Sequence, residues 1–481
     1  MTLGRRQVLG AFASVGLAAG LSSEEAAARS ASRAASHSAS QGGELECDVA
    51  IIGGGAAGTY AALALRDRGL SVLVVERSER LGGHCETFHD PASGAAIDIG
   101  VIVFPDNALV RNHFGRFGVP LVNANFSGGS SQFVDFRTGR AVAAFQPSPL
   151  AVGTALATYL QILETRFPFL DQNGFQLPEA GPLLEELLLP FGQWVSLYGL
   201  EALLPTFFLY EQGFGPLLDA TTLYVLKNMS RAVVGGVLQG SFLLAPAGAA
   251  ALYEAASVEL GSDVLYGSEI CQVERGHGEA DACVRLRVRS GGVERSVRAA
   301  RLLFTAPPVM ANFSAFDLDR RESSLFSSFE RHHYWTAVAQ IEGMPPGVSL
   351  VNAAPDTAYN LPPLPGIYSI GPNAAPGLFD VKYGSDGYLP DRVVKSRIEA
   401  DIARVAAQPI NALQFGGFSI FKSHSPYSVV VSPERIRAGF YASLQGLQGY
   451  RNSYYAGAAF QTHSSAAVWA HLEELLPTLA A

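Results

Sequence analysis

The sequence predicts an α/β protein in which a discontinuous Rossmann-type domain is combined with a second domain of mixed sheet and helices. Two short apolar runs, Cys47–Ile52 and Ser71–Glu76, flank a glycine-rich turn and an Ala/Leu-rich stretch, which is the pattern of a βαβ unit. Strand-like runs return at 263–307 and at 452–456, so this sheet is expected to draw strands from distant parts of the chain. A chain of 481 residues is also too long for one core, and we expect two or three domains.

The composition is that of a folded protein and argues against several function classes. Hydrophobic residues make up 48% of the chain and charged residues 16%. The formal net charge of −9 argues against a partner nucleic acid and against a basic membrane-binding surface. The 4 cysteines are too few for a disulfide scaffold, and no Cys or His cluster has metal-ligand spacing. We expect no metal site and no integral membrane span in the mature chain.

The first 44 residues are interpreted as a twin-arginine export signal, residues 1–28, followed by a flexible linker, residues 29–44. The Arg5–Arg6 pair precedes the apolar run Val8–Leu21, and small residues that suit a cleavage site follow. This run is shorter than the roughly 20 residues that span a bilayer. We therefore expect an exported protein, periplasmic or secreted. An amphipathic or disordered tail is the alternative.

The rest of the chain is expected to alternate between the two domains. Residues 45–115, 256–310 and 431–481 are assigned to the Rossmann-type domain. Residues 116–255, a helix-rich segment, and residues 311–430 are assigned to the second domain. The helix-rich segment has many aromatic residues, which suit either a pocket for a greasy or planar substrate or an ordinary helical core.

The glycine-rich turn has the spacing of a dinucleotide site. Gly53 permits the tight turn out of the strand, Gly55 lets the backbone approach a pyrophosphate, and Gly58 lets the helix pack closely on the strand. The first helical residues, Ala57 among them, offer free N–H groups and a partial positive charge to the phosphates. Glu76 ends the second strand, where its carboxylate can accept hydrogen bonds from the adenosine ribose and disfavours a 2′-phosphate.

The segment after the second strand separates FAD from NAD. Arg80-Leu-Gly-Gly-His84 resembles the RxGGR/H signature of the flavin amine-oxidase superfamily, where it lies along the pyrophosphate and toward the flavin. Ile97–Val101 is similar to the family's segment beside the isoalloxazine, and Glu269–Val273 to the strand that contacts adenine. Tyr454–Gly457, followed by a helix, resembles the C-terminal FAD motif.

The resemblance implies that the Rossmann-type domain is FAD-binding and that the second domain binds the substrate. Besides the glycine turn and Glu76, it implies these cofactor-binding residues: Arg77, Arg80, Gly83, His84, Gly100, Val101, Ile270, Gly457, Ala458, Ser465 and Ala466.

Two positions depart from the family pattern. His84 stands where the amine oxidases most often have Arg, and Ala458 stands where the family usually has Glu. The contact of that Glu must be replaced, and a backbone N–H is the candidate. No cysteine follows Cys283, which excludes a C-terminal cysteinyl link to the flavin. We expect non-covalent FAD.

Two branches of the superfamily are most similar to this chain. Gly83–Cys85, His424–Tyr427 and Gly457–Phe460 resemble fungal β-cyclopiazonate dehydrogenase-like enzymes. Gly213–Gly215 and Gly446–Gly449 resemble the bacterial polyenoic fatty acid isomerase. The Arg with which that isomerase anchors its substrate carboxylate has no convincing match here.

Three residues are candidates for catalysis. Tyr427 follows the strand-like run Gly416–Lys422 and stands where the family places aromatic residues near the flavin. His424 can exchange a proton near neutral pH, and Tyr210 can line the pocket. The structural alternatives are a packed tyrosine, a surface-loop histidine and a core tyrosine.

These patterns and resemblances predict an FAD-dependent oxidoreductase. It would take a hydride from a small or medium-sized hydrophobic substrate onto flavin N5, with oxygen as a candidate acceptor. One alternative is a redox-neutral double-bond isomerase of polyunsaturated fatty acids, which returns the hydride to another carbon. A third hypothesis is a flavin-binding protein without catalysis.

Overall fold

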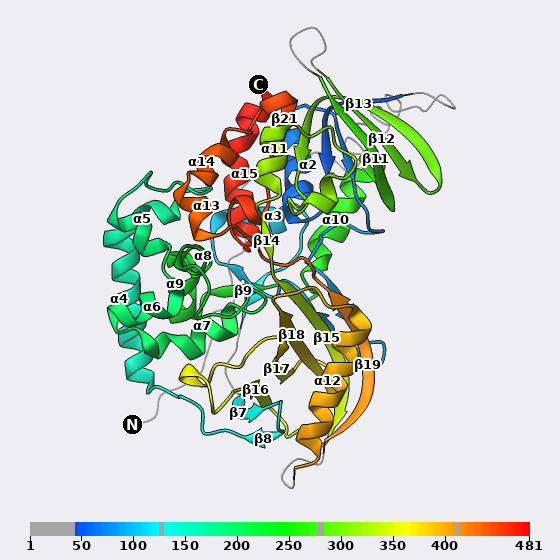
Figure 1. Cartoon of the computed structure of the whole chain (residues 1–481). Helices are drawn as coiled ribbons and strands as arrows, with labels where there is room; N and C mark the ends of the chain where they lie inside the picture. The colour runs from blue at the N-terminus through cyan, green and yellow to red at the C-terminus, as the bar shows by residue number, and fades with distance from the viewer. Residues whose placement is uncertain (1–43, 125–128, 277–282, 409–412) are drawn as a thin grey trace, which may run out of the picture.

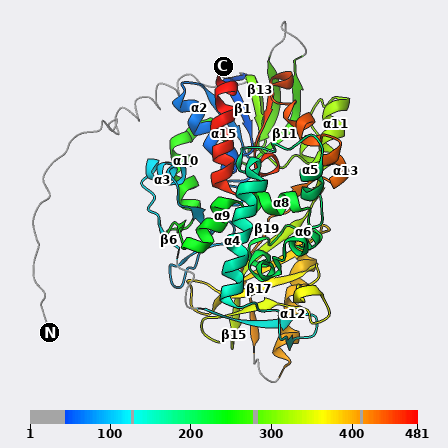
Figure 2. The same ribbon diagram turned by 90° about the vertical axis from the view of Figure 1, so that its left-hand side faces the viewer.

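The computed structural model describes residues 44–124, 129–276, 283–408 and 413–481. The expected export signal and nearly all of the expected linker lie outside these residues. Figures 1 and 2 show a sheet with its helices at the top, a second sheet below it, and a group of helices beside both. No helix in the described part of the chain is both long and apolar enough to cross a bilayer.

The predicted βαβ unit is confirmed. β1 (Leu45–Ile52) leads through the glycine turn into α2 (Ala56–Asp67), and β2 (Val72–Val75) returns parallel to β1. Alternate residues of β1 pack into different apolar clusters: Val49 and Ile51 lie with α2, whereas Ala50 and Ile52 face the other side. Both faces of the sheet are therefore covered, which explains why these strands are apolar throughout.

The first sheet collects strands from three distant parts of the chain, as predicted for a discontinuous Rossmann-type domain. Its order is β10-β2-β1-β13-β12-β11, and β21 pairs with the end of β13. β10, β2, β1, β13 and β21 run parallel, whereas β11, β12 and β13 form an antiparallel meander. The added strands are β10 (Val264–Leu265), β11 (Ser268–Arg275), β12 (Val284–Ser290), β13 (Val293–Phe304) and β21 (Ser453–Tyr455). The domain boundaries assigned from the sequence stay predictions.

The second sheet has the order β19-β15-β18-β17-β16-β7-β8. Helix α12 (Asp391–Ala406) covers one face, where Val394 and Ile398 pack with Trp335 and Tyr383. The opposite face contributes to a cavity shared with the first domain. The strands are β7 (Ser130–Asp135), β8 (Arg140–Ala141), β15 (His333–Glu342), β16 (Val348–Asn352), β17 (Gly366–Pro372), β18 (Leu378–Ser385) and β19 (Gln414–Ser423).

The helical lobe, residues 149–239, explains the aromatic content of the middle of the chain. Phe191, Trp194 and Phe207 are completely buried, and their rings pack on one another and on Tyr159. These aromatic residues form the core of the lobe. The helices are α4 (Pro149–Arg166), α5 (Pro182–Leu187), α6 (Phe191–Tyr198), α7 (Leu204–Tyr210), α8 (Thr222–Asn228) and α9 (Arg231–Gln239).

Shorter elements connect these parts, and α15 (Ser465–Ala480) packs on α2. The others are β3 (Thr87–His89), β4 (Ala96–Asp98), β5 (Phe104–Pro105), α3 (Ala108–Arg116), β6 (Val122–Asn123), β9 (Phe242–Leu244), α10 (Ala250–Leu260), α11 (Arg320–Phe326), β14 (Glu330–Arg331), β20 (Val429–Val430), α13 (Pro433–Arg437) and α14 (Phe440–Gln445).

Candidate active site

The glycine turn has the geometry that a pyrophosphate requires. Gly53 has a φ of +100°, which a residue with a side chain rarely adopts. A Cβ on Gly58 would lie 1.8 Å from the carbonyl oxygen of Gly53, so α2 reaches the strand only because this position is glycine. A Cβ on Gly55 would meet only the Cα of Gly83, at 3.9 Å, among the described residues. The front of the turn is therefore open.

The predicted adenosine side lies at the edge of this turn. Glu76 Oε2 accepts a hydrogen bond from Gly54 N at 2.6 Å, which holds the carboxylate beside the glycines. The backbone oxygen of Glu76 accepts from Ser268 N at 2.9 Å, so the strand that carries Ile270 starts next to Glu76. Ile270 is half-buried in β11, and Arg77 is exposed. Their contacts with a nucleotide stay predictions.

The segment Arg80–His84 packs directly on the glycine turn. Gly82 N donates to Gly54 O at 2.8 Å. The Arg80 guanidinium turns back and donates to the carbonyl oxygens of Gly83 and Cys85 and to Glu86. Arg80 therefore fixes the shape of this loop.

The next predicted segment meets His84. A Cβ on Gly100 would lie 1.7 Å from the carbonyl oxygen of His84, and Val101 N donates to the same oxygen at 3.2 Å. The two predicted flavin-side segments are thus in backbone contact.

The C-terminal motif closes the same site from the other end of the chain. Gly457 has a φ of +117°, and Ser465 Oγ lies 4.0 Å from Cys85 Sγ. Trp469 Nε1 donates to Ala56 O at 3.1 Å, which holds α15 beside the start of α2. The first turns of α2 and α15 are therefore brought together. Ala57 lies in the first turn of α2, Ser465 and Ala466 begin α15, and Ala458 precedes it. An open glycine turn, an acidic residue and two helix N-termini fit FAD.

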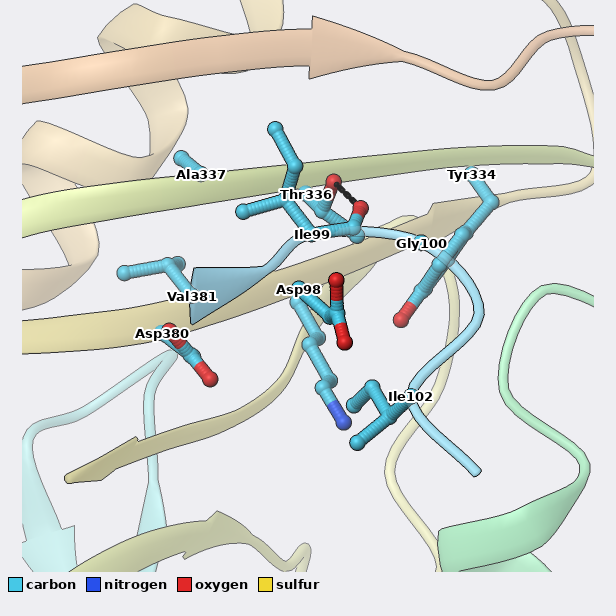
Figure 3. Close-up of a pocket in the computed structure, with 10 residues that line it drawn as sticks. Asp98, Ile99, Gly100, Ile102, Tyr334, Thr336, Ala337, Asp380 and Val381 are labelled. Carbon is cyan, nitrogen blue, oxygen red and sulfur yellow. Dashed lines mark hydrogen bonds between the residues drawn. The ribbon is translucent and has the colours of Figure 1, made fainter. Parts of the chain in front are cut away.

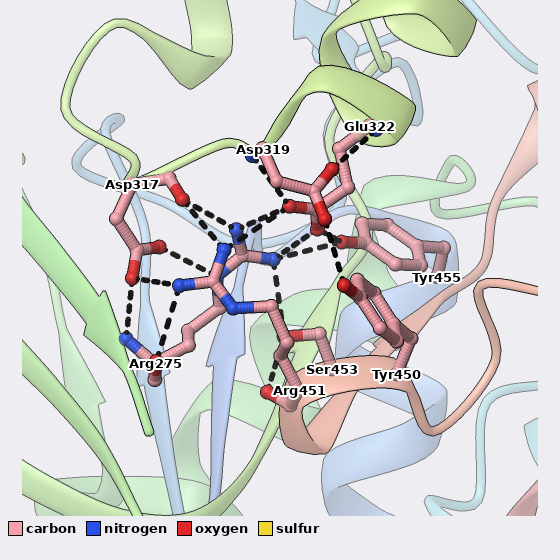
Figure 4. Close-up of polar contacts among 8 residues, drawn as sticks. All are labelled: Arg275, Asp317, Asp319, Glu322, Tyr450, Arg451, Ser453 and Tyr455. Atoms are coloured by element: carbon pink, nitrogen blue, oxygen red, sulfur yellow. Dashed lines mark hydrogen bonds and ion pairs between the residues drawn. The ribbon is translucent and has the colours of Figure 1, made fainter. Parts of the chain in front are cut away.

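A buried ion network fixes the strand that leads into the C-terminal motif (Figure 4). The side chains of Arg275 and Glu322 are both 0% exposed and form an ion pair. Arg451 joins them, with Nη1 3.3 Å from Glu322 Oε2 and a second ion pair to Asp317. Tyr455 of β21 donates its hydroxyl proton to Glu322 at 3.1 Å. We refer to these residues as the ion network.

The predicted catalytic tyrosine lies in a group of rings, which we call the site cluster: His84, Phe214, His424, Tyr427 and His463. His424 is buried and the other four are half-buried. Tyr427 stacks on His84, with 5.6 Å between ring centroids, and packs on His463 at 4.6 Å. Phe214 contacts Tyr427 and His463, and His424 contacts His84. The cluster joins the Arg80–His84 loop, the helical lobe, the end of β19 and the C-terminal motif.

The pKa shifts in the site cluster favour the neutral forms of its histidines and of Tyr427. Burial, with smaller contributions from His424 and His463, holds the pKa of His84 well below its usual range. Burial lowers the pKa of His463 to about 4 and raises that of Tyr427 above its ordinary value.

His424 and Tyr210 differ from what the sequence suggested about their surroundings. His424 is only 4% exposed, and its Nε2 lies 2.8 Å from the carbonyl oxygen of Ile99, which also accepts from Thr336 Oγ1. The His424 ring therefore holds the segment that contains Ile99, which is the segment expected beside the flavin. His424 is buried and does not lie in a surface loop. Tyr210 ends α7, is 36% exposed and makes no ring contact with the site cluster among the described residues. The catalytic roles of both stay predictions.

A small cavity of about 30 Å³ lies beside the cluster, between Gly100 and the second sheet (Figure 3). Tyr334, Asp380 and Lys382 line it from the sheet. Burial raises the pKa of Asp380 to about 6 and lowers that of Lys382. The sheet thus presents polar groups to the predicted flavin-side segment.

Known proteins with similar sequences identify the family. Residues 51–117 match the family model of the NAD(P)-binding Rossmann-like domain. FAD-dependent oxidoreductase dpchF of Colletotrichum higginsianum is 35% identical over 444 residues, which cover 89% of this chain and 91% of that protein. The chain belongs to the FAD-dependent oxidoreductases. β-Cyclopiazonate dehydrogenase of Aspergillus oryzae is 32% identical over 433 residues, covering 90% of this chain and 93% of that enzyme. This oxidoreductase is therefore an enzyme that binds FAD, and the predicted resemblance is confirmed.

Solved structures agree on the fold. The CLA-producing fatty acid isomerase from P. acnes superposes with a TM-score of 0.72 at 20% identity, covering 90% of this chain and 98% of that chain. Cyclohexylamine oxidase from Brevibacterium oxydans superposes with a TM-score of 0.63 at 18% identity, covering 90% and 98%. The α/β fold with an FAD-binding Rossmann-type domain is confirmed.

Proposed function

We propose that this FAD-dependent oxidoreductase oxidises a small or medium-sized hydrophobic molecule, with oxygen as the final electron acceptor. The bound flavin supplies the hydride acceptor, N5. The observation that supports the proposal is the half-buried, aromatic site cluster where the cofactor segments meet the second domain. Apolar and aromatic walls with few polar groups are typical of sites for hydrophobic small molecules.

The chain's own contribution is to position the substrate and exclude water. Tyr427 and His463 offer ring faces and edges against which a flat or apolar substrate can pack. His424 holds the Ile99 carbonyl and so fixes the neighbouring Gly100 and Val101 backbone. Such positioning affects the rate more than the stability of the protein.

A substrate screen tests the proposal. Protein purified with its flavin is mixed in air with amines, indolines, allylic alcohols and unsaturated fatty acids, and peroxide is measured. We expect at least one compound to reduce the flavin and yield peroxide. Tyr427→Ala should lower the rate of flavin reduction by about 100-fold, whereas Tyr388→Ala, at a side chain that is 66% exposed, should not change it. If no compound changes the flavin spectrum, the proposal is wrong.

The second candidate is a redox-neutral isomerase of polyunsaturated fatty acids, favoured by the fold shared with the fatty acid isomerase. Anaerobic incubation with linoleic acid distinguishes the two functions. An isomerase converts many equivalents while its flavin stays oxidised, whereas an oxidase is reduced once and stops.

Export is a separate proposal, supported by the Arg5–Arg6 pair ahead of the apolar run. Replacing both arginines with lysine should retain the protein in the cytoplasm, as measured by cell fractionation. An unchanged distribution would contradict a twin-arginine signal.

A further inference from the structure

Glu211 is a buried carboxyl group beside the site cluster. It directly follows α7 and is 3% exposed. Among the described residues, its carboxylate accepts one hydrogen bond, from Asn228 Nδ2 at 2.8 Å, and no arginine or lysine pairs with it. Burial, opposed only by this hydrogen bond, raises the pKa of Glu211 to about 8.

Glu186, in the same lobe, shows that burial by itself does not raise the pKa of a carboxyl group. Glu186 is 7% exposed but accepts hydrogen bonds from Arg166, Trp194 and Tyr198. Burial alone would raise the pKa of Glu186. The pKa is lowered instead, because the hydrogen bonds from Arg166, Tyr198 and Trp194 outweigh the effect of burial. Glu211 differs because it has no cationic partner.

Two connections link Glu211 to the site cluster, and each runs through neighbouring residues. Through the backbone, Gly213 lies so close to Tyr427 that an added Cβ would be 2.5 Å from the ring. Through side chains, Asn228 Oδ1 accepts from Thr462 Oγ1 at 3.2 Å, and Thr462 precedes His463 of the site cluster. Glu211 therefore adjoins the cluster from the helical lobe and is also linked to the C-terminal motif.

The titratable groups that face Glu211 are tyrosines. Tyr159 of α4, Tyr368 of β17 and Tyr427 each have a pKa raised first by burial and further by the negative charge of Glu211. All three stay protonated at neutral pH, so Glu211 is the group in this set that gains or loses a proton between pH 6 and 9.

We propose that Glu211 takes up the proton that the substrate loses as it is oxidised. This inference rests on the proposed function. The substrate's C–H bond breaks and its hydrogen leaves with two electrons as the hydride that the flavin accepts. The N–H or O–H bond on the adjacent atom breaks, its electron pair forms the new C=N or C=O bond, and its proton passes to the Glu211 carboxylate. The substrate class is then a hydrophobic amine or alcohol.

Glu211→Gln tests the assignment, because the amide keeps the size of the side chain and an oxygen for Asn228. Flavin reduction is followed anaerobically in a stopped-flow instrument with indoline and with cinnamyl alcohol as probes, from pH 6 to 9.5. In the wild type, the rate with an active probe should rise with pH and level off above about pH 8, because the ionised carboxylate is the acceptor. Glu211→Gln should be about 100-fold slower or more, without that pH dependence.

Glu186→Gln is the matched control and should keep the wild-type pH profile. If the flavin of Glu211→Gln is reduced at the wild-type rate at every pH, the inference is wrong and the proposed function is unaffected. If another amine or alcohol of the screen reduces the flavin of the wild type and the two probes do not, that compound replaces them in the same test. If only the unsaturated fatty acids of the screen reduce it, the assigned substrate class is wrong. If no compound reduces the wild type, both proposals fall.

Infrared difference spectroscopy tests the proton on Glu211 without any substrate. The wild-type holoenzyme should lose a carboxylic acid C=O band as the pH rises through about 8, and Glu211→Gln should lack that band. Absence of the band from the wild type, or its loss in the ordinary range of a glutamic acid, overturns the inference.

Discussion

Glu322 in the ion network and Glu211 beside the site cluster are both buried carboxylates, yet their surroundings are opposite. Glu322 meets Arg275, Arg451 and the hydroxyl of Tyr455. Glu211 meets one neutral amide and a set of tyrosines. A compensated buried charge holds elements together, whereas an uncompensated one remains free to change its protonation state near neutral pH. The presence or absence of cationic partners therefore distinguishes the ion network, which stabilises the cofactor domain, from the surroundings of Glu211, which suit proton transfer.

The largest effect is expected from breaking the ion network. Glu322→Gln removes the fully buried one of the two carboxylates that pair with Arg275, and Asp317 remains as the other. Removing one partner of such a buried pair costs about 3–5 kcal/mol in the free energy of unfolding. Urea denaturation of the holoenzyme measures this change in the free energy of unfolding. The flavin content should fall together with the stability, because β21 leads into the C-terminal motif. A loss below about 1 kcal/mol would show that the network is not a source of stability.

Glu211→Gln should change how stability depends on pH. The folded state holds a proton on Glu211 up to about pH 8, whereas the unfolded chain loses it near 4.5. The wild type is therefore expected to lose stability relative to the variant as the pH rises from 4.5 to 8. The difference between the two proteins should shift by an amount on the order of 2–4 kcal/mol between pH 5 and 9. Parallel stability curves would contradict the raised pKa of Glu211.

A smaller effect is expected where Gly213 contacts Tyr427. Gly213 has a φ of +87°, and an added Cβ would overlap the tyrosine ring. Gly213→Ala should cost about 1–3 kcal/mol and also slow flavin reduction by displacing Tyr427. Gly240→Ala is the control, since its φ is +60° but nothing lies within 4 Å of its Cβ. Equal losses in both variants would mean that backbone strain alone is responsible.

The smallest effect is expected at an exposed ion pair. Arg437 and Glu185 form hydrogen bonds at 2.8 and 2.9 Å, yet both side chains are about half exposed. Water and salt screen such a pair, so Glu185→Gln should leave the midpoint of thermal unfolding unchanged within error. A clear decrease would show that exposed pairs in this protein also carry stability.

The cofactor half of the site could be predicted because its signals are local. The strand, the glycine turn, the helix and Glu76 follow one another along the chain, and each residue type has its own geometric reason. The contacts between Gly82 and Gly54 and between Gly100 and His84 then follow from packing consecutive segments.

The substrate half could be predicted only in part, because its residues come together through tertiary packing. Tyr427 and His84 belong to different motifs, and neither motif indicates that their rings stack on each other. His463 and Glu211 were missed. Both carried a weak signal, since Glu211 is the only charged residue between 202 and 218, and His463 lies within the C-terminal motif. Nothing in the sequence distinguished Glu211 from Glu186, because only the structure shows which of them has an arginine beside it.

The contact between Trp469 and Ala56 has a consequence for biosynthesis. Helix α15 completes the binding site that α2 begins, and Trp469 follows Ala56 by 413 positions in the sequence. A ribosome must have translated past Trp469 before this contact can form, so a shorter nascent chain lacks this side of the site. The two sides of the cofactor site can therefore meet only after both ends of this long segment have been synthesised.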